Sequence, residues 1–289
     1  MIGGAMRKDG LRGAVKGIAV ILTIVMFLLM FLPMWNVLVV STQKALDAGR
    51  SGMKLWWHSF SLEGYAYVFR VTKMGRPLCN SLFVTLTGTV IQVILAGFSG
   101  YVLVQKGLPF RKQISGFIMV TMMIPGDLTL ISIYQLNKQM HLLNSYQGLI
   151  LNGLISGFSI LMMRNYFETV PYTLGESARI DGAGEVAIFA KIYIPIALPG
   201  LATVFFLEFV ARWNSIMLPA TLITDEGKYT LPLKLKQMIL NVNSVSGTEM
   251  IPDNAIMAAV LISALPLLVI YLFAQRFLLE GISMGAVKE

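Results

Sequence analysis

Charge is scarce in this chain: Asp, Glu, Lys and Arg together make up 13% of its 289 residues. A soluble domain typically carries about 25%. Hydrophobic residues reach 56%, and apolar runs of about 20 residues recur, which is long enough to cross a hydrocarbon core. The low charge excludes an ordinary soluble domain, and the long apolar runs predict an integral membrane protein.

Cysteine and histidine are nearly absent. The single cysteine, Cys79, excludes an internal disulfide framework. The two histidines, His58 and His141, lie too far apart in sequence to suggest a local metal motif. We find no nucleophile–base grouping, so no catalytic residue, no metal site and no membrane enzyme is predicted.

The chain also lacks the phosphate-binding pattern G-x-x-x-x-G-K-[ST], which excludes ATP binding of that type. We therefore expect no cofactor in this chain, and any ATP-driven activity must draw on another subunit. The net charge of +8 fits a membrane protein with basic loops. Because no basic–aromatic recognition motif accompanies that charge, nucleic acid is rejected as a partner.

Six apolar segments predict an all-α membrane protein, with spans at about residues 17–40, 80–104, 115–134, 147–166, 199–223 and 255–278. The first segment follows a basic head and is too long for a signal peptide, so we expect a retained span. Residues 41–78 are polar, which predicts a surface loop with short interfacial helices or part of a surface for a partner outside.

The stretch Pro171–Leu201 is a polar island between two apolar runs. Helix-forming residues lie on either side of Asp181-Gly182-Ala183-Gly184, a sequence that does not continue a straight helix without cost. We therefore predict a helix, a tight bend and a second helix, ended by Pro195 and Pro199 before the next span. A bent helix pair at a membrane surface suits binding by a partner protein.

This stretch resembles the EAA loop of permease subunits of binding-protein-dependent ABC importers. The pattern P-x-x-L-x-E-A-A-x-x-D-G-A, followed by F-x-x-I-x-L-P-x-x-x-P, is met by Pro171, Leu174, Glu176, Ala178, Asp181, Gly182, Ala183, Phe189, Ile192, Pro195 and Pro199. Ser177 and Ile194 are mild departures. The resemblance is to the carbohydrate branch that includes the maltose permease, and it runs from about Asn80 to the C-terminus.

The resemblance implies the type I (MetI-like) fold of six transmembrane helices with cytoplasmic EAA coupling helices. It divides the chain into residues 1–78, a transmembrane domain at 79–280 with the EAA loop at 168–198, and a cytoplasmic tail at 281–289. The expected partners are a homologous second permease subunit in a heterodimer, a cytoplasmic ATPase dimer that binds ATP and Mg, and a periplasmic or extracellular solute-binding protein. The residues expected in the ATPase groove are Glu176, Ser177, Ala178, Arg179, Asp181, Gly182 and Ala183.

Two further segments take their roles from the resemblance. The tail resembles that of maltose-type permeases at Gln275, Arg276, Phe277, Leu278, Gly281, Gly285, Val287 and Lys288, and would reach between the ATPase subunits. The outer loop at residues 224–254 would contact the solute-binding protein, with a short amphipathic helix near Tyr229–Ile239. An uninvolved surface loop stays an alternative.

Basic residues divide almost evenly between the two sides of the membrane. The clusters beside the first span and in the Lys106–Lys112 turn favour a cytoplasmic N-terminus, since short loops weigh most. The EAA resemblance points the same way, because that loop faces the ATPase. We expect a multi-pass protein of the bacterial cytoplasmic (inner) membrane with both termini in the cytoplasm.

Charged residues also lie within the predicted spans. Glu208 and Arg212 are four apart, so they share a helix face and could pair. Charges at such depth normally face a bundle interior or a water-filled path. The residues expected to line a substrate cavity are Glu208, Arg212, Asn214, Asp127, Asn152, Tyr134 and Gln135. A purely structural Glu–Arg pair between helices is an equal alternative.

The substrate class follows from resemblance alone. The segment SILMMRNYF at residues 159–167, the Trp213-Asn214 pair and the tail are similar to the LplC/YtcP-like permeases for complex oligosaccharides, a group that includes importers of alginate. We expect an oligosaccharide, and an acidic one. A neutral sugar or sugar derivative is the alternative. An ion-coupled secondary transporter is less favoured, since such proteins usually have more spans with inverted repeats.

Overall fold

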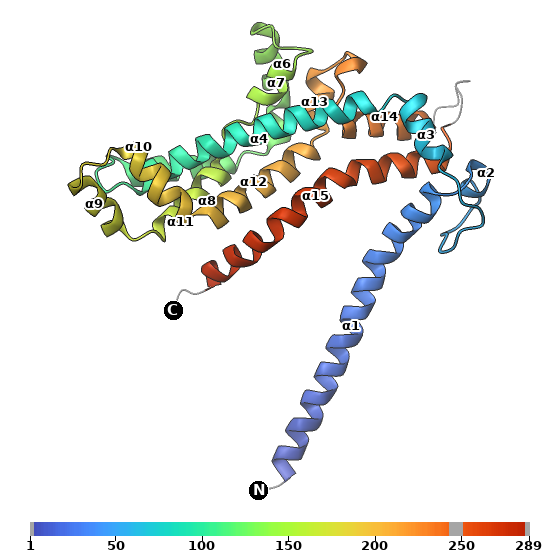
Figure 1. Ribbon diagram of the computed structural model, residues 1–289, viewed down its shortest axis with the longest axis horizontal. Coiled ribbons are helices and arrows are strands. Elements are labelled where there is room, and N and C mark those ends of the chain that lie inside the picture. The colour runs from blue at the N-terminus through green and yellow to red at the C-terminus, as the bar shows by residue number, and fades with distance from the viewer. Residues whose placement is uncertain (1–2, 243–250, 287–289) are drawn as a thin grey trace. The chain divides into compact units, whose positions relative to one another are not determined.

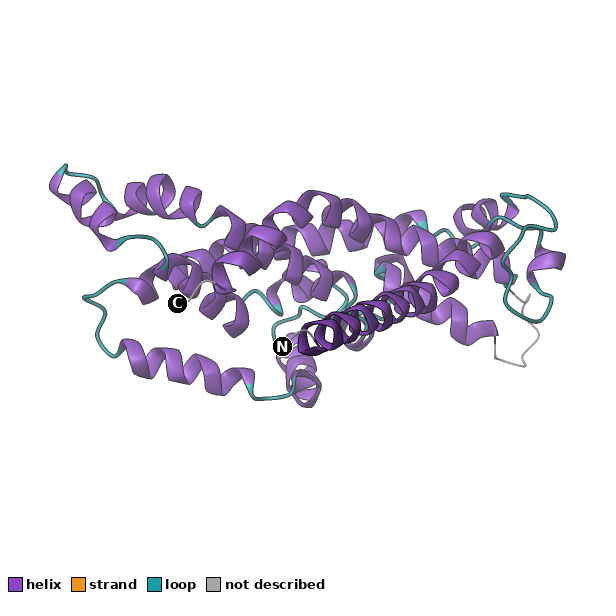
Figure 2. Ribbon diagram, turned by 90° about the horizontal axis from the view of Figure 1, so that it is seen from below, coloured by secondary structure: helices purple, strands orange, loops and turns teal. Residues whose placement is uncertain are grey.

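The computed structural model describes residues 3–242 and 251–286, with side chains for residues 15–126, 128–240 and 251–279. All regular structure within these ranges is helical, which confirms the all-α prediction (Figures 1 and 2). The helices are α1 (Gly3–Ser41), α2 (Ala45–Ala48), α3 (Glu63–Arg70), α4 (Gly75–Val104), α5 (Arg111–Met122), η1 (Gly126–Thr129), α6 (Leu130–Gln139), α7 (Tyr146–Leu151), α8 (Gly157–Glu168), α9 (Tyr172–Ile180), α10 (Glu185–Ile188), η2 (Phe189–Tyr193), α11 (Ile194–Ile196), α12 (Leu198–Trp213), α13 (Met217–Leu222), η3 (Glu226–Lys228), α14 (Leu231–Val242) and α15 (Asp253–Ala286).

The chain forms two compact units. The first comprises residues 1–73 and 238–262, and the second comprises residues 74–237 and 263–289. Helices α14 and α15 therefore contribute to both. The division by role expected from the sequence, at residues 78 and 280, stays a prediction.

The first unit is dominated by the long helix α1. The most apolar 18-residue window of its stretch Val15–Ser41 has a mean hydropathy of 2.6, and no residue of that window is buried within the chain. A helix apolar on all sides requires lipid or another protein around it, and the stretch matches the predicted first span. Beyond α1, Asn254 donates a hydrogen bond to the backbone oxygen of Gln43 (2.9 Å), which joins α15 to the loop after α1.

Three helices of the described chain are long and apolar enough to cross a membrane: Val15–Ser41, Gly75–Val104 and Asp253–Leu279. A fourth span is formed if Glu185–Ile196 and Leu198–Trp213, bent by 80°, count as one. The predicted spans at 115–134, 147–166 and 199–223 are wrong as continuous helices, because each is split into shorter helices. Pro125-Gly126 interrupts the first of these, and Gly153 at φ +90° interrupts the second.

Close packing of α4 on α8 forms the centre of the second unit. A Cβ atom on Gly100 would lie 2.8 Å from the backbone nitrogen of Arg164 and 2.9 Å from the Cβ atom of Met163. Glycine at this crossing lets the two backbones approach, as small residues do in membrane helix pairs. Around the crossing lies an apolar cluster that includes Ala96, Ile160 and Val204.

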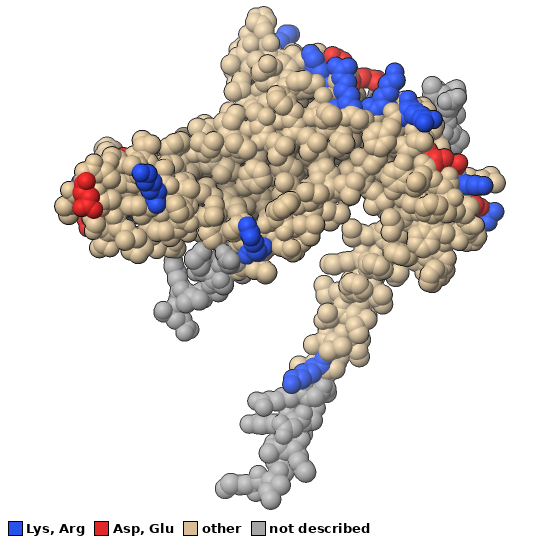
Figure 3. All heavy atoms as spheres, viewed as in Figure 1, with Lys and Arg blue, Asp and Glu red and all other residues tan. Residues whose placement is uncertain are grey.

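The space-filling view shows where charge lies on the second unit. In the face shown, Lys, Arg, Asp and Glu gather around α9 and α10 at one end and around α13 and α14 at the other (Figure 3). The surface of α4 and α12 between these ends is almost free of charged side chains. A band free of charge between two charged ends is the pattern that a bilayer requires.

Candidate functional site

The bend after α9 is a helix C-cap built around Gly182. Gly182 has φ +83°, and its N–H donates to the carbonyl of Arg179 (3.0 Å), while the N–H of Ala183 donates to the carbonyl of Ala178 (2.9 Å). These two bonds define a Schellman motif with glycine in the left-handed conformation. The Asp-Gly-Ala sequence therefore fixes where α9 ends and how sharply the chain turns into α10, which confirms the predicted helix–bend–helix.

Arg179 joins the two sides of this bend. Its Nε donates to Glu185 Oε1 (2.6 Å) and its Nη2 to Gln105 Oε1 (2.8 Å), so α9 is tied to α10 and to the end of α4. Tyr101 on α4 donates to the second oxygen of Glu185 (2.5 Å). The hydrogen bonds to Glu185 raise the pKa of Arg179 further above its ordinary high value, so the link keeps its charge at every physiological pH.

Aromatic packing anchors the segment that follows the bend. Tyr101 of α4, Phe167 of α8, and Phe189 and Tyr193 of the π-helical turn η2 lie with ring centroids 4.8–6.4 Å apart. All four are buried. Aromatic clusters combine large buried area with defined geometry, so a displacement of α9 and α10 would be transmitted to α4 and α8. We call residues 171–196 the coupling arm.

Pro195 explains the π-helical turn. Proline has no N–H, and in a regular helix its ring would clash with the carbonyl four residues earlier. Widening the preceding turn, Phe189–Tyr193, accommodates that ring. Pro195 therefore does not stop the helix, contrary to the prediction from sequence, and the sharp bend comes at Ala197, where Pro199 lies in the first turn of α12.

The coupling arm presents a mixed polar and apolar surface. Ile180 is 86% exposed and Val186 is 75% exposed. Of the residues expected in the ATPase groove, Glu176, Ser177, Asp181 and Gly182 are exposed, whereas Ala178, Arg179 and Ala183 are half-buried. The side chain of Arg179 thus binds Glu185 and Gln105 instead of extending from the exposed surface, which the sequence did not predict.

Substituting Arg179 with methionine is expected to loosen the coupling arm without unfolding it. Charged hydrogen bonds are worth about 1.5–3 kcal/mol, but this link is partly exposed and so weaker. We expect amide exchange in α9 and α10 to become roughly 2- to 10-fold faster. Deuterium uptake, followed by mass spectrometry, measures the exchange rate in α9 and α10. The control is Lys191→Met, a change at an exposed position of the same arm. Equal exchange in both variants would contradict the structural role of Arg179.

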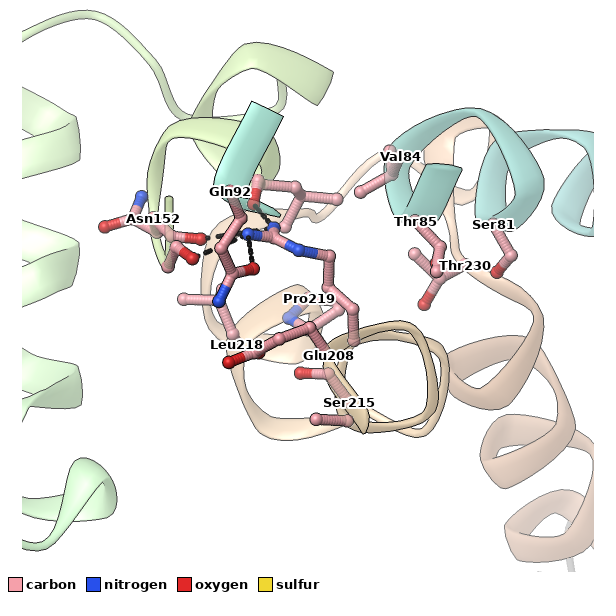
Figure 4. Close-up of a pocket in the computed structure, with 14 residues that line it drawn as sticks. Ser81, Val84, Thr85, Gln92, Asn152, Glu208, Ser215, Leu218, Pro219 and Thr230 are labelled. Carbon is pink, nitrogen blue, oxygen red and sulfur yellow. Dashed lines mark hydrogen bonds between the residues drawn. The ribbon is translucent and has the colours of Figure 1, made fainter. Parts of the chain in front are cut away.

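A cavity lined by both apolar and polar side chains lies between α4, α7, α12 and α13 in the second unit (Figure 4). Its volume is about 190 Å³. The lining residues are Ser81, Val84, Thr85, Gln92, Leu149, Asn152, Gly153, Glu208, Ala211, Arg212, Ser215, Leu218, Pro219 and Thr230. Polar atoms from several elements thus converge in a largely apolar bundle, which is typical of a ligand or transport site.

Three of the seven residues expected at a cavity line this one: Glu208, Arg212 and Asn152. Asn214 is exposed at the end of α12, and Tyr134 and Gln135 on α6 do not line the cavity, so the structure does not bring these three residues to it. The side chain of Asp127 lies outside the described residues. Sequence reasoning missed Gln92, whose only signal was a polar amide in the middle of a long apolar helix.

Glu208 and Arg212 face the same cavity but bind different partners. Arg212 Nη2 donates to Gln92 Oε1 (2.9 Å) and to the carbonyl of Gly153 (2.7 Å), and Glu208 accepts a hydrogen bond from Ser159 Oγ. The ion pairs found among the described side chains do not include Glu208 with Arg212. The mutual pair considered from the sequence is therefore not formed.

The loop that precedes α14 is held by two asparagines. Asn144 Oδ1 accepts hydrogen bonds from the backbone N–H of Thr224 (2.6 Å) and Asp225 (3.0 Å), and Asn80 donates to the carbonyl of Gly227 (3.1 Å). The expected short helix is present as α14. Residues 243–250, part of the expected contact with a binding protein, lie outside the described chain. So do Val287 and Lys288 of the tail and the side chains of Gly281–Ala286.

Comparison with known proteins agrees with this architecture. The family described as "Binding-protein-dependent transport system inner membrane component" matches residues 88–283. The polygalacturonan/rhamnogalacturonan transport system permease YtcP of Bacillus subtilis is 31% identical over 275 residues, covering 91% of this chain and 96% of that protein. The arabinooligosaccharide permease AraQ of the same organism is 26% identical, covering 95% of this chain and 97% of that one.

Among solved structures, a bacterial ABC transporter involved in the import of the acidic polysaccharide alginate superposes with a TM-score of 0.83 and 25% identity, covering 94% of this chain and 98% of that chain. The family match extends over more than half of the sequence and includes the whole coupling arm and α12. The relatives are matched over nearly their full length. This chain therefore belongs to the inner-membrane components of binding-protein-dependent transport systems, as a permease subunit of an ABC importer.

Proposed function

We propose that this chain forms one half of the translocation path of an ATP-driven importer for an oligosaccharide delivered by an external binding protein. The observation that carries this proposal is the coupling arm. Its bend is fixed by the Gly182 cap, its base is anchored in α4 and α8 by buried aromatic rings, and its outer surface exposes apolar side chains. Such an arm can transmit a push from a partner into the helices that line the cavity.

The proposed partner of the arm is a cytoplasmic ATPase dimer. Exposed Ile180 and Val186 would be covered by an apolar groove, and Glu176 and Asp181 at its edge would meet basic or polar groups of the ATPase. ATP and Mg would bind to that subunit. We propose that the arm and both chain termini lie in the cytoplasm. The basic turn Lys106–Lys112 beside the arm supports a cytoplasmic arm, and the Nζ atom of Lys106 lies 3.8 Å from the ring centroid of Tyr172.

The size of the cavity favours a translocation path that is shared with a second permease subunit. Its volume of about 190 Å³ is below the range of about 300–1,000 Å³ usual for small-molecule sites. An oligosaccharide therefore does not fit in this chain alone, and a homologous subunit in a heterodimer would supply the opposite wall. Polar side chains such as Asn152 and Thr85 suit the hydroxyl groups of a sugar.

An acidic oligosaccharide is the substrate class that we propose. The alginate transporter and YtcP are named for acidic or uronate-containing polysaccharides. AraQ, named for arabinooligosaccharides, favours the second candidate, a neutral oligosaccharide.

Reconstitution tests the proposal. The chain would be purified with its co-expressed permease, ATPase and binding protein and placed in proteoliposomes, and uptake of labelled uronate and neutral oligosaccharides of equal length would be compared. We expect uptake only with ATP and the binding protein, and faster uptake of the uronate. Uptake that persists with a catalytically dead ATPase under an ion gradient would refute an ATP-driven importer, and preference for the neutral chain would select the second candidate.

A further inference from the structure

The helical segment that lines the cavity is interrupted between α7 and α8, at residues 152–156. A helix that ends leaves its last carbonyl groups without partners, and a helix that begins leaves its first N–H groups without partners. At membrane depth such groups must be satisfied by the protein, because each unsatisfied group costs several kcal/mol in hydrocarbon. The break therefore requires polar or charged side chains from a neighbouring helix.

Arg212 meets the carbonyl end of this break. Its Nη2 binds the carbonyl of Gly153, and its Nη1 lies 3.5 Å from the carbonyl oxygens of Leu149, Ile150 and Asn152. Gly88 on α4 provides the room, because a Cβ atom there would lie 2.7 Å from the guanidinium carbon of Arg212. A cation at the carbonyl end of a helix is stabilising, since the partial charge there is negative.

Glu208 meets the amide end of the same break. Ser156 caps α8, with its Oγ accepting from the N–H of Ser159 (3.3 Å), and the Ser159 hydroxyl in turn donates to Glu208. An anion near the first turn of a helix is stabilising for the opposite reason. Because residues four apart on α12 lie one turn apart on the same face, the Glu208–Arg212 spacing matches the two ends of the break.

We propose that Glu208 and Arg212 are positioning residues that clasp the break at residues 152–156 against α12, each charge complementing one helix end. The clasp holds Asn152 and Gly153 in the cavity wall during transport. It differs from a mutual ion pair and from a site that reads the charge of a substrate. The inference concerns the cavity of the proposed function, but the fold alone carries it, whichever glycan passes.

Exchanging the two charges separates these three roles. In the charge-swapped variant, Glu208→Arg is combined with Arg212→Glu. The single changes are Arg212→Lys and Gly88→Ala, and the control is Ser215→Ala, at a residue that lines the same cavity. Each is made in the complete transporter in lipid nanodiscs. Deuterium uptake of residues 149–160 is measured together with KM and the maximal rate for a uronate and a neutral oligosaccharide of equal length.

The clasp predicts that swapping the two charges accelerates amide hydrogen exchange at residues 149–160 by about 10- to 100-fold, since each helix end then faces the wrong charge. Gly88→Ala should accelerate amide exchange in the same segment although every charge is kept. Arg212→Lys, which keeps the positive charge, should retain most of the protection, and Ser215→Ala should leave amide exchange unchanged. Native amide exchange in the variant with the two charges swapped would establish a mutual ion pair between residues 208 and 212 and overturn the clasp. Native amide exchange in Gly88→Ala, together with a KM raised for the uronate alone in the charge-swapped variant, would establish a substrate site and would also overturn the clasp.

Discussion

Replacing Gly182 with proline is expected to abolish ATP-driven uptake while leaving the membrane helices folded. Gly182 has φ +83°, whereas proline is fixed near −65°. Proline also lacks the N–H that Gly182 donates to the carbonyl of Arg179 (3.0 Å). Proline also disfavours the near-helical backbone of the preceding Asp181 (φ −73°, ψ 1°). A cost of about 3 kcal/mol lowers the population of the native bend roughly 100-fold.

The matched control is Gly182→Asn. Asparagine tolerates the left-handed conformation better than other residues with a side chain, and the space around Gly182 is open, since a Cβ atom added there would have no neighbouring atom within 4 Å. We expect uptake in proteoliposomes below a tenth of the native rate for proline and near the native rate for asparagine, with co-purification of the ATPase following the same order. Native uptake by Gly182→Pro would show that the shape of the bend is irrelevant to coupling.

The second large effect is expected from Gly100→Ala, which should destabilise the membrane-embedded bundle itself. The added Cβ would lie 2.8 Å from the backbone nitrogen of Arg164 and 3.0 Å from the backbone carbon of Met163. Backbone atoms cannot rotate away as a flexible side chain can, so α4 and α8 must separate. Overpacking of this kind costs about 1–3 kcal/mol, which corresponds to a fall of roughly 2–12 °C in Tm.

Gly97→Ala provides the comparison, one helical turn away on α4. Its Cβ would lie 3.6 Å from Phe189 and 3.9 Å from Leu201, which is ordinary contact. Thermal unfolding of the purified complex in detergent, followed by tryptophan fluorescence, is expected to show a lower Tm for Gly100→Ala and a nearly native Tm for Gly97→Ala. Equal values would mean that α4 and α8 do not pack as closely as described.

The sequence predicts the features that depend on local chemistry. Gly182 and its neighbours predict the bend because a left-handed cap needs glycine whatever surrounds it. The end of the first span is predicted to within one residue (Val40 against Ser41), because an unbroken apolar run needs no partner to be recognised.

Features set by distant residues escape prediction. Arg212 binds Gln92, 120 positions away, and no local pattern connects the two. Arg179 lies within a motif that resembles a partner-binding surface, yet Gln105, 74 positions away, draws it inward. The splits of the predicted spans at 115–134 and 147–166 are missed because a hydropathy window averages over a Pro-Gly or a single glycine. Such breaks are stable only where side chains such as Arg212 satisfy the backbone.

Cross-linking from the coupling arm tests the central claim most directly. Ser177 is exposed on α9, and the native Cys79 would first be replaced by alanine so that Ser177→Cys provides the one reactive thiol. We expect this thiol to cross-link to the ATPase subunit in membranes and to react with an impermeant maleimide in inside-out vesicles but not in intact cells. Labelling in intact cells, or a cross-link to the external binding protein instead, would contradict the account.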